Sequence, residues 1–563
     1  MSSVLQAVEG SRLMRDIAEV ARWTKLAGTP TEVESLRYFA AELQTIGFSA
    51  TLLHHDAYIS LPGPARIVVA GQVVAAITHS FSRPSPAEGL TAGIVDIGRG
   101  HASDYAGRDL RGRIVLIDGI ATPETSKLAS AAGAMGQIHV SPHEQRYAMC
   151  ISPVWGSPTM ELRDRLPSTV VATISGPDGR RLREALAVSP VEATLFAEVD
   201  TGWRKTPLLV ADMASEAGTP DEPFVLLSGH NDTWYFGVMD NGAANATMLE
   251  IARVLAPQRA RWKRGLRLCF WSGHSQGRYS GSAWYADAHW AELERRCVAH
   301  VNVDSTGGMN AVDLSETASM SLLHALAKEA VEEHAGQSYV GKRRGRSGDD
   351  SFGGIGVPSM FGPVSEQPKG DSNGRRNLGW WWHTPEDLAD KVDEAHLVRD
   401  TRVVGHAVWR LVTDEILPID LQAQLRDLQA QLEPLSAAAA ARDLCEPIAV
   451  AAARLAATIT DTTAALKAGG IAGQAMLNEA IRSACRALVP VDYTSGDRFA
   501  HEPALPVPAW PALEPLRRLA REANEADIPF RAVSAMRARN HLLHALQLAD
   551  AAFAHASQAR DQR

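Results

Sequence analysis

Residues 225–255, VLLSGHNDTWYFGVMDNGAANATMLEIARVL, decide the fold. An apolar run ends in a loop that carries His230 and Asp232, a second loop carries Asp240, and a helix is predicted to begin near Ala243. Loops at strand ends hold the functional side chains of α/β proteins. Imidazole and carboxylate groups together suit zinc, and Asp232 is placed to hold the His230 ring in one tautomer. The alternative interpretation is an ordinary Asp-Asn-Gly turn.

The region around this stretch, residues 206–410, alternates predicted strands with predicted helices. Apolar runs such as PFVLLSGH, LRLCFWSGH, CVAHVNVDS and VPSMFGP are separated by helical patterns such as ATMLEIARVLA and SLLHALAKEAVEEHA. This alternation is typical of an α/β fold, with a doubly wound, mostly parallel sheet that has helices on both faces.

The flanking regions have other patterns. Residues 8–48 predict two helices, the second with Thr31 as its N-cap. Residues 56–205 contain short β-rich runs and one predicted helix at SKLASAAGAMG, which indicates a small inserted module. Residues 411–563 are Ala- and Leu-rich and predict helices, with PALPVPAWP as a linker between two of them.

Length and composition indicate a multi-domain globular protein. The chain has 563 residues, 45% of them hydrophobic and 21% charged, and a net charge of −9. This charge gives no reason to expect nucleic acid or an anionic membrane as a partner. Five scattered cysteines without a C-x-x-C pair favour a reducing compartment. Since neither a secretory signal nor a membrane-spanning run is recognisable, we expect a cytoplasmic protein.

Two further residues occupy predicted strand or loop ends. Asp304 ends the apolar run AHVNVDS, and His383 lies in WWWHTPEDLADKVD. Each alone is as readily explained as a hydrogen-bonded polar residue. Together with His230 and Asp240, however, they form a set of two imidazoles and two carboxylates, which predicts a metal site.

The order of these motifs resembles one enzyme family. A His-x-Asp motif, Asp-Asn, a strand and loop before Gly-Ser, a strand ending in Asp, and His-Thr are similar to the co-catalytic zinc aminopeptidase/carboxypeptidase family, which includes glutamate carboxypeptidase, glutaminyl cyclase and the transferrin receptor. SGHNDTWYFGVMDNGAA and RSGDDSFGGIGVPSMF resemble the glutamate carboxypeptidase type. LRGRIVLIDG and ASAAGAMGQIHV resemble a protease-associated domain, and the helical tail resembles a dimerisation domain.

The resemblance implies a domain arrangement and a ligand set. Residues 1–55 and 206–410 would form the catalytic domain, residues 56–205 the protease-associated insertion, and residues 411–563 a domain that forms a homodimer. His230, Asp240 and Asp304 would bind one metal ion, Asp240 would bridge to a second, and His383 would bind that second ion. Asp232 would orient His230, and the Asp240–Asn241 bond would be cis. Zinc is the expected metal, as one or two ions.

The chain departs from the family at the motif before Gly281-Ser282, and a second departure is the run of tryptophans 380–382 beside His383. The family has a Glu-Glu pair before Gly-Ser, but FWSGHSQGRYSGSAWYA contains no carboxylate. One alignment places Ser275 and Gln276 at the pair, and another places His274 and Ser275 there. Ser and Gln are neutral and cannot act as a general base. His274 can act as a base or as a replacement ligand, or it can be a packing residue in a site that has lost its function.

Aromatic and basic residues near these motifs are candidates for binding substrate. Trp382 precedes His383 and Trp234 follows His230, so they can line an aromatic pocket, although core packing is an equal alternative. In a core strand, Trp381 would point away from its two Trp neighbours. Arg278 and the basic run at 342–346 can bind a substrate carboxylate, whereas a solvated face is the alternative for most of that run.

These features favour a metal-dependent hydrolase that cleaves an amide or peptide bond in a small peptide or an N-acyl amino acid. His274 would assist the removal of a proton from water, or no side chain would do so if a metal-bound hydroxide suffices. Because the Glu pair is missing, a lyase, a cyclase or a hydrolase of a specialised small molecule is the main alternative. A receptor-like binding protein without catalysis is a third, and the four candidate ligands count against it.

Overall fold

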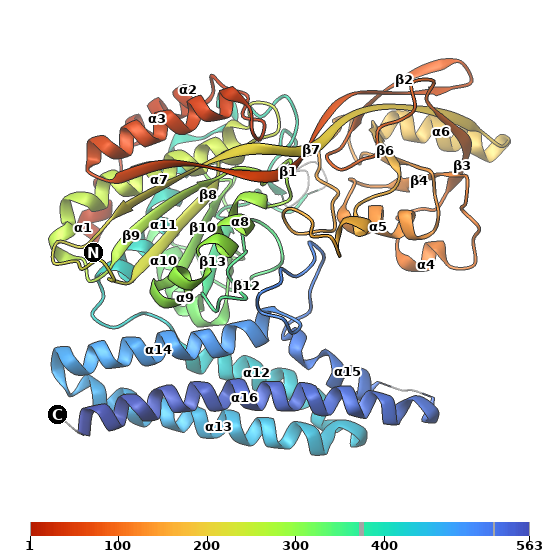
Figure 1. Ribbon diagram of the computed structural model, residues 1–563. Coiled ribbons are helices and arrows are strands. Elements are labelled where there is room, and N and C mark those ends of the chain that lie inside the picture. The colour runs from red at the N-terminus through yellow and green to blue at the C-terminus, as the bar shows by residue number, and fades with distance from the viewer. Residues whose placement is uncertain (1, 371–376, 522–523, 562–563) are drawn as a thin grey trace.

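The computed structural model describes residues 2–370, 377–521 and 524–561. The chain forms a body of sheet and helices, a β-rich lobe beside it and a helical bundle below (Figure 1). In the part of the chain that the structure describes, no helix is long and apolar enough to cross a membrane.

The body is built on a mixed sheet whose strand order is β1-β7-β9-β8-β10-β13-β11-β12. The strands are β1 (Ser49–Val69), β7 (Glu192–Met213), β8 (Phe224–His230), β9 (Gly265–Trp271), β10 (Cys297–Asp304), β11 (Ala318–Ser319), β12 (Lys342–Arg343) and β13 (Ser359–Pro363). The central four strands, β9, β8, β10 and β13, are parallel, while β7 pairs antiparallel with β9. The carboxyl ends of the central strands therefore meet at one edge of the sheet.

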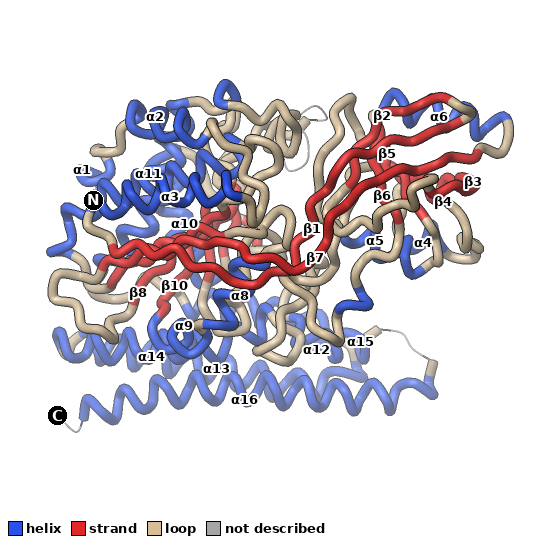
Figure 2. Tube along the Cα trace, turned by 45° about the horizontal axis from the view of Figure 1, so that its top comes forward, coloured by secondary structure: helices blue, strands red, loops and turns tan. Residues whose placement is uncertain are grey.

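Helices cover both faces of this sheet (Figure 2). They are α1 (Ser2–Leu5), α2 (Gly10–Val20), α3 (Pro30–Ile46), α7 (Ala244–Leu255), α8 (Ser280–Ala288), α9 (Trp290–Arg296), α10 (His324–Ala335) and α11 (Glu394–Thr413). One core joins the sheet to α2, α3, α7 and α11, and a separate cluster joins it to α8 and α9. Because both faces are covered, every residue of β8, β9 and β10 is buried.

The lobe continues the same sheet. Its elements are β2 (Gln72–Thr78), β3 (Leu90–Asp96), α4 (Ala102–Tyr105), β4 (Ile114–Asp118), α5 (Pro123–Ala131), β5 (Gly136–Val140), β6 (Val170–Ile174) and α6 (Gly176–Val188). Its strands follow the order β1-β2-β6-β5-β4-β3-β7, and β1 also pairs with β7, so the strands close on themselves. The lobe contains the predicted helix at α5, while its protease-associated character stays a prediction.

Two long strands connect the lobe to the body. β1 and β7 run unbroken through the boundaries expected at 55/56 and 205/206, and they pair antiparallel along almost their whole length. The register shifts once, between Pro62 and Ala65, as in a β-bulge, which bends a strand locally.

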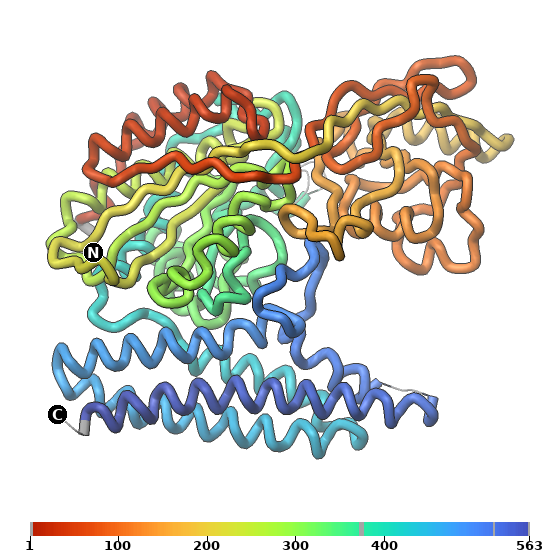
Figure 3. The backbone as a smooth tube through the Cα atoms, viewed as in Figure 1, coloured from red at the N-terminus to blue at the C-terminus, as the bar shows by residue number. Residues whose placement is uncertain are grey.

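The C-terminal region is helical, as the sequence predicts. Its helices are α12 (Leu421–Ala437), α13 (Ala439–Lys467), α14 (Gly470–Tyr493), α15 (Glu514–Ala520) and α16 (Ile528–Asp561). The chain between α14 and α15, which contains the proline-rich PALPVPAWP, rises from the bundle toward the junction of body and lobe (Figure 3).

The start of α3 differs from the prediction. The helix begins at Pro30 with Thr29 as N-cap, so the expected N-cap at Thr31 is wrong. Proline fits the first helical position because its missing N–H has no helical partner there in any case, and its φ is already helical.

Buried histidines in the lobe predict a loss of stability in acid. Burial lowers the pKa of His79 to about 3, and its Nε2 lies 2.7 Å from Thr173 Oγ1. An unfolded histidine titrates near pH 6.5, so between about pH 6.5 and 3 only the unfolded chain takes up this proton. His79 should therefore lower the free energy of unfolding by up to about 1.4 kcal/mol per pH unit as the pH falls through that range.

Urea unfolding at pH 7, 6 and 5 checks this, with wild type and His79→Gln compared. The variant should show a weaker dependence of the lobe's unfolding free energy on pH. An identical dependence in both proteins would contradict the assignment, and His101→Gln, which changes an exposed histidine of the same lobe, is the control.

Candidate metal and substrate site

The predicted site residues meet at the carboxyl edge of the parallel strands. His230 is the last residue of β8 and Asp304 the last of β10. Asp240 lies in the π-helical turn Val238–Ala243 between β8 and α7, and its peptide bond to Asn241 is cis, as the resemblance implied. His383, in a turn before α11, has a φ of 61°, a backbone conformation that a residue other than glycine rarely adopts.

The amide of Asn241 connects these strand ends. Its Nδ2 donates to the carbonyls of His230 and Val303, and its Oδ1 accepts from the N–H of Ser305. Asp387 fixes the same turn from the other side, because its two carboxylate oxygens accept the N–H groups of Met239 and Asp240. Buried polar groups that are all satisfied in this way hold one arrangement rigidly.

Three imidazoles are oriented by acceptors at Nδ1. His230 Nδ1 lies 2.7 Å from the carbonyl of Asp232, His383 Nδ1 lies 2.6 Å from the carbonyl of Ala148, and His274 Nδ1 lies 2.9 Å from Asp349 Oδ2. Each acceptor requires the ring to carry its proton on Nδ1, so the Nε2 of each neutral ring has a free lone pair. This is the arrangement of histidines that ligate a metal or accept a proton.

Two carboxylates face two of these nitrogens. His230 Nε2 lies 3.3 Å from Asp240 Oδ1 and 3.8 Å from Asp304 Oδ1, and His383 Nε2 lies 3.1 Å from Asp240 Oδ2. His230 Nε2 is buried and makes no hydrogen bond to any residue that the structure describes. A buried polar atom of this kind, beside two carboxylates, fits a divalent cation.

The electrostatics of the site point the same way. Burial favours the neutral acid of Asp240, but His230 and His383 hold its pKa well below the usual range. Burial also disfavours charge on His230, yet Asp240 and Asp304 raise the pKa of that ring well above its ordinary value. The site thus attracts positive charge, and a metal ion would displace the proton that His230 otherwise takes up.

His274 stacks on His230. The ring centroids are 3.7 Å apart and the planes differ by 14°. Although ligand atoms of His230, His274 and Asp304 lie within 4.8 Å of one another, the lone pair of an imidazole nitrogen lies in its ring plane. Two nearly parallel planes do not meet at one ion within bonding distance, so this geometry favours His274 as a neighbour of a metal site rather than as a shared ligand.

The two residues after His274, Ser275 and Gln276, lie in different surroundings. The pocket is lined by His274 and Ser275 but not by Gln276. The Gln276 side chain points inward, where Oε1 accepts from Ala27 N and Nε2 donates to the carbonyl of Thr233. Of the two alignments considered, the one that places His274 and Ser275 at the site therefore fits the geometry.

Asp232 orients His230 through another group than predicted. Its backbone carbonyl, rather than its carboxylate, orients His230. The carboxylate instead accepts the N–H groups of His274 and Ser275, at 3.0 and 2.8 Å. Asp232 is fully buried, and it fixes the loop that presents His274.

The pocket above these residues is built from three regions of the chain. The body contributes Trp234, Asp240, His274, Ser275, Arg278, Tyr279, Asp304, Arg346, Leu378, Trp382 and His383, among others. The lobe contributes Thr122, Pro123, Glu124, Met149 and Cys150, and the C-terminal region contributes Ala504, Leu505, Pro506 and Val507. The proline-rich segment predicted as a linker is thus also a wall of the pocket.

The aromatic residues divide between pocket and core. Residues 380–382 form a turn, so the core strand considered for them is wrong. Trp382 lines the pocket and stacks on His383 with centroids 3.5 Å apart, whereas Trp381 is buried elsewhere and Trp380 is partly exposed. Trp234, the other tryptophan considered for the pocket, also lines it.

The basic residues also lie in different surroundings, some at the pocket and others in ion pairs. Arg278 and Arg346 line the pocket. Arg343 pairs with Asp492 of the C-terminal region, and Arg344 is buried in an ion pair with Asp350, so the solvated face considered for this run is wrong for both. Only Lys342, paired with Glu366 at the surface, fits it.

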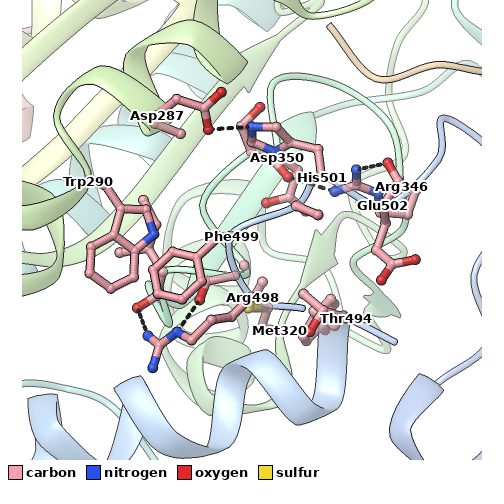
Figure 4. A pocket seen from close by; sticks show the side chains of 17 residues that line it. Asp287, Trp290, Met320, Arg346, Asp350, Thr494, Arg498, Phe499, His501 and Glu502 are labelled. Atoms are coloured by element: carbon pink, nitrogen blue, oxygen red, sulfur yellow. Dashed lines mark hydrogen bonds and ion pairs between the residues drawn. The ribbon is translucent and has the colours of Figure 1, made fainter. Parts of the chain in front are cut away.

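A neighbouring pocket shows how the segment after α14 is attached to the body (Figure 4). His501 Nε2 lies 3.0 Å from Asp287 Oδ1, and Arg346 donates to the carbonyl of Glu502. Ala504 N donates to the carbonyl of Pro153 in the lobe. These contacts bring Ala504–Val507 to the site, and no local sequence pattern indicates them.

Sequence reasoning gave no role to two carboxylates. Asp349 Oδ2 binds His274, while Asp349 Oδ1 accepts from Ser282 Oγ at 2.8 Å. Asp387 binds the Asp240 turn, and burial raises its pKa to about 7. Both lie in stretches that the resemblance covers, RSGDDSF and HTPEDLAD, but spacing alone does not reveal their partners.

Comparison with known proteins agrees with this geometry. Residues 209–408 match the model of peptidase family M28. The chain is 22% identical to a protein of Zea mays named "Probable glutamate carboxypeptidase", over 75% of this chain and 69% of the relative. It is 25% identical to aminopeptidase YwaD of Bacillus subtilis, over 71% of this chain and 84% of the relative.

Solved structures share the fold. A zinc aminopeptidase of Bacillus subtilis superposes with a TM-score of 0.56 at 22% identity and covers 72% of this chain and 96% of its own. A structure titled peptidase M28 precursor of Shewanella amazonensis superposes with a TM-score of 0.59 at 18% identity and covers 74% and 96%.

The fold and the matches define a metallopeptidase-like hydrolase that depends on a divalent metal. Residues 209–408, which match the model of peptidase family M28, carry all four predicted ligands. The match agrees with the resemblance to the co-catalytic zinc aminopeptidase/carboxypeptidase family that the motif order indicated.

The inward position of Gln276 yields a test. Gln276→Ala should lower the free energy of unfolding by roughly 1–3 kcal/mol, because Ala27 N and the Thr233 carbonyl lose their partner. Zinc content should stay that of wild type. Chemical denaturation and elemental analysis check both values, with the exposed Gln72→Ala as control. Loss of zinc without loss of stability would instead make Gln276 part of the site.

Proposed function

We propose that this chain is a metal-dependent hydrolase that cleaves an amide or peptide bond of a small peptide or N-acyl amino acid. The observation that carries the proposal is the set of buried carboxylates and Nδ1-oriented histidines at the floor of the pocket. His230 Nε2, which has no hydrogen-bond partner among the described residues and lies beside Asp240 and Asp304, is the point where an ion fits best.

The proposed metal ligands are the side chains around His230 Nε2. His230, Asp240 and Asp304 would hold one ion, most simply zinc, and His383 with the second oxygen of Asp240 offers a place for another. When bound, the metal supplies an electrophile that acidifies water and polarises a carbonyl. The carbonyl of Asp232 keeps His230 in the tautomer that metal binding needs, and the carbonyl of Ala148 does the same for His383.

His274 is the base of this proposal. His274 lines the pocket and Asp349 engages its Nδ1, so the neutral ring offers the lone pair of Nε2, which would accept a proton from the attacking water and return it to the leaving nitrogen. Burial favours the neutral acid of Asp349, but His274 and Ser282 keep the pKa of that carboxyl below its usual range. Asp349 therefore remains a carboxylate that orients the ring and stabilises its charged form.

The pocket walls support a small substrate. Segments of the lobe and of the C-terminal region enclose it opposite the ligands, and Trp234 and Trp382 offer apolar contact beside the reacting bond. Arg278 makes no ion pair with any described residue; its Nη2 donates to the carbonyl of Ala504 at 3.3 Å, and its guanidinium lies 4.8 Å from the centroid of the Tyr279 ring. We assign it to the carboxylate of the substrate.

The domain assignments belong to the same proposal. We propose residues 1–55 and 206–410 as the catalytic unit, 56–205 as a protease-associated-like insertion and 411–563 as a homodimerisation region. The pocket supports the first two, because both units contribute walls. Homodimerisation rests on the resemblance of the helical tail.

Metal removal with a substrate panel tests the function. Purified protein should hydrolyse at least one member of a panel of dipeptides and N-acyl amino acids. Dialysis against a chelator should abolish turnover, and zinc should restore it. Asp304→Asn should bind less zinc and lose turnover, whereas the exposed Asp390→Asn should match wild type. A zinc-loaded protein inert to the whole panel would favour a lyase, a cyclase or a specialised substrate, and absence of bound metal would overturn the proposal.

A double-mutant cycle tests the pair His274 and Asp349. His274→Ala should lower kcat by about 10²–10⁴-fold. Asp349→Asn should lower kcat by a smaller factor, with KM and zinc content unchanged, and should add little in the His274→Ala background, because it acts through that ring. If the two effects multiply independently, or if His274→Ala loses zinc, the assignment as base is wrong.

A further inference from the structure

A second group of ligand-type side chains lies away from the pocket, between α10 and α11. Glu333 and His334 lie in the last turn of α10, and His406 faces them from α11. The side chain of His406 is fully buried and that of His334 is nearly so, while a third of the Glu333 side chain is exposed. We call these three residues the helix-pair cluster.

The spacing of the helix-pair cluster matches that of ligands around one ion. His334 Nε2 lies 3.1 Å from His406 Nδ1. Glu333 lies 3.6 Å from His406 Nδ1 through Oε2 and 4.0 Å from His334 Nε2 through Oε1. Ligands bound at about 2.0–2.2 Å to a tetrahedral zinc ion are separated by roughly 3–4 Å. The two rings, at 70° to each other, direct their lone pairs from different planes.

A carboxylate lies on the far side of His406. His406 Nε2 lies 3.2 Å from Glu329 Oε1, without the geometry of a hydrogen bond, and Arg410 pairs with both oxygens of Glu329. The negative charge of Glu329 favours the tautomer that carries its proton on Nε2, which leaves the lone pair of Nδ1 on the side of His334 and Glu333. Carboxylates beside the second nitrogen of a histidine are usual around protein metal ions.

The Glu333 carboxylate has no Lys or Arg as an ion-pair partner in the part of the chain that the structure describes, although Arg402 lies near His334 and Arg410 near His406. Burial lowers the pKa of both His334 and His406, so both rings are neutral near pH 7. Glu329, unlike Glu333, is compensated by Arg410. One negative charge beside two neutral imidazoles favours a divalent cation.

We propose that Glu333, His334 and His406 bind a zinc ion that joins α10 to α11, separate from the pocket. The exposed side of Glu333 leaves the fourth position open to water. The ion would stabilise the helix pair and takes no part in the reaction. The competing arrangement contains no ion: His334 Nε2 donates a hydrogen bond to His406 Nδ1, and Glu333 stays unpaired.

Zinc content and thermal stability of the full-length protein distinguish the two. His334→Ala and Glu333→Gln should each contain one zinc fewer per chain than wild type, or bind that ion at least about 10-fold more weakly. Glu332→Gln, a neighbour on the exposed side of α10, should match wild type. Chelation should lower the Tm of wild type, and of Asp304→Asn, by more than that of His334→Ala.

The outcomes are decisive even if one variant is damaged. Should His334→Ala fail to fold by circular dichroism, Glu333→Gln decides, because its partly exposed side chain can be changed without a cavity. Zinc stoichiometry and affinity in folded Glu333→Gln equal to those of wild type would overturn the proposal. Turnover should be the same in wild type and Glu333→Gln, so failure here is separable from failure of the pocket assignment.

Discussion

The amide of Asn241 is the interaction on which the pocket depends. It donates to backbone carbonyls at the ends of β8 and β10 and accepts an N–H just beyond β10. Only an amide of this length supplies two donors and an acceptor in one plane, since a carboxylate would meet two carbonyls with no proton to offer. Because Asn241 adjoins Asp240, the same contacts hold His230, Asp240 and Asp304 within reach of one ion.

The sequence predicts the metal ligands of the site because apolar runs show where the central strands end. His230 and Asp304 follow uninterrupted apolar runs, which in a parallel sheet with both faces covered must be central strands. Their carboxyl ends then meet at one edge, and the order of the motifs supplies Asp240 and His383. Charge, tautomer and hydrogen bonding within the site depend on contacts that this reasoning does not reach.

The unpredicted part consists of partners far apart in the chain. His274 is oriented by Asp349, and His383 by the carbonyl of Ala148 in the lobe. Gln276 points into the protein, whereas His274 and Ser275 line the pocket. The sequence does not predict this difference, because a loop has no periodicity from which the direction of a side chain could be inferred. The proline-rich segment connects two helices, as its composition predicts, but local composition says nothing about where such a connection lies in space.

The long pair β1 and β7 has a mechanical consequence. A continuous antiparallel ladder behaves as a stiff ribbon, because bending it in its plane would break many hydrogen bonds at once. The lobe therefore cannot swing on a loose hinge, although it carries part of the pocket wall. The bulge between Pro62 and Ala65 is the one irregularity in the register of this ladder, so the ribbon bends most easily there. Any change of pocket width that involves the lobe should therefore turn on the angle at this point.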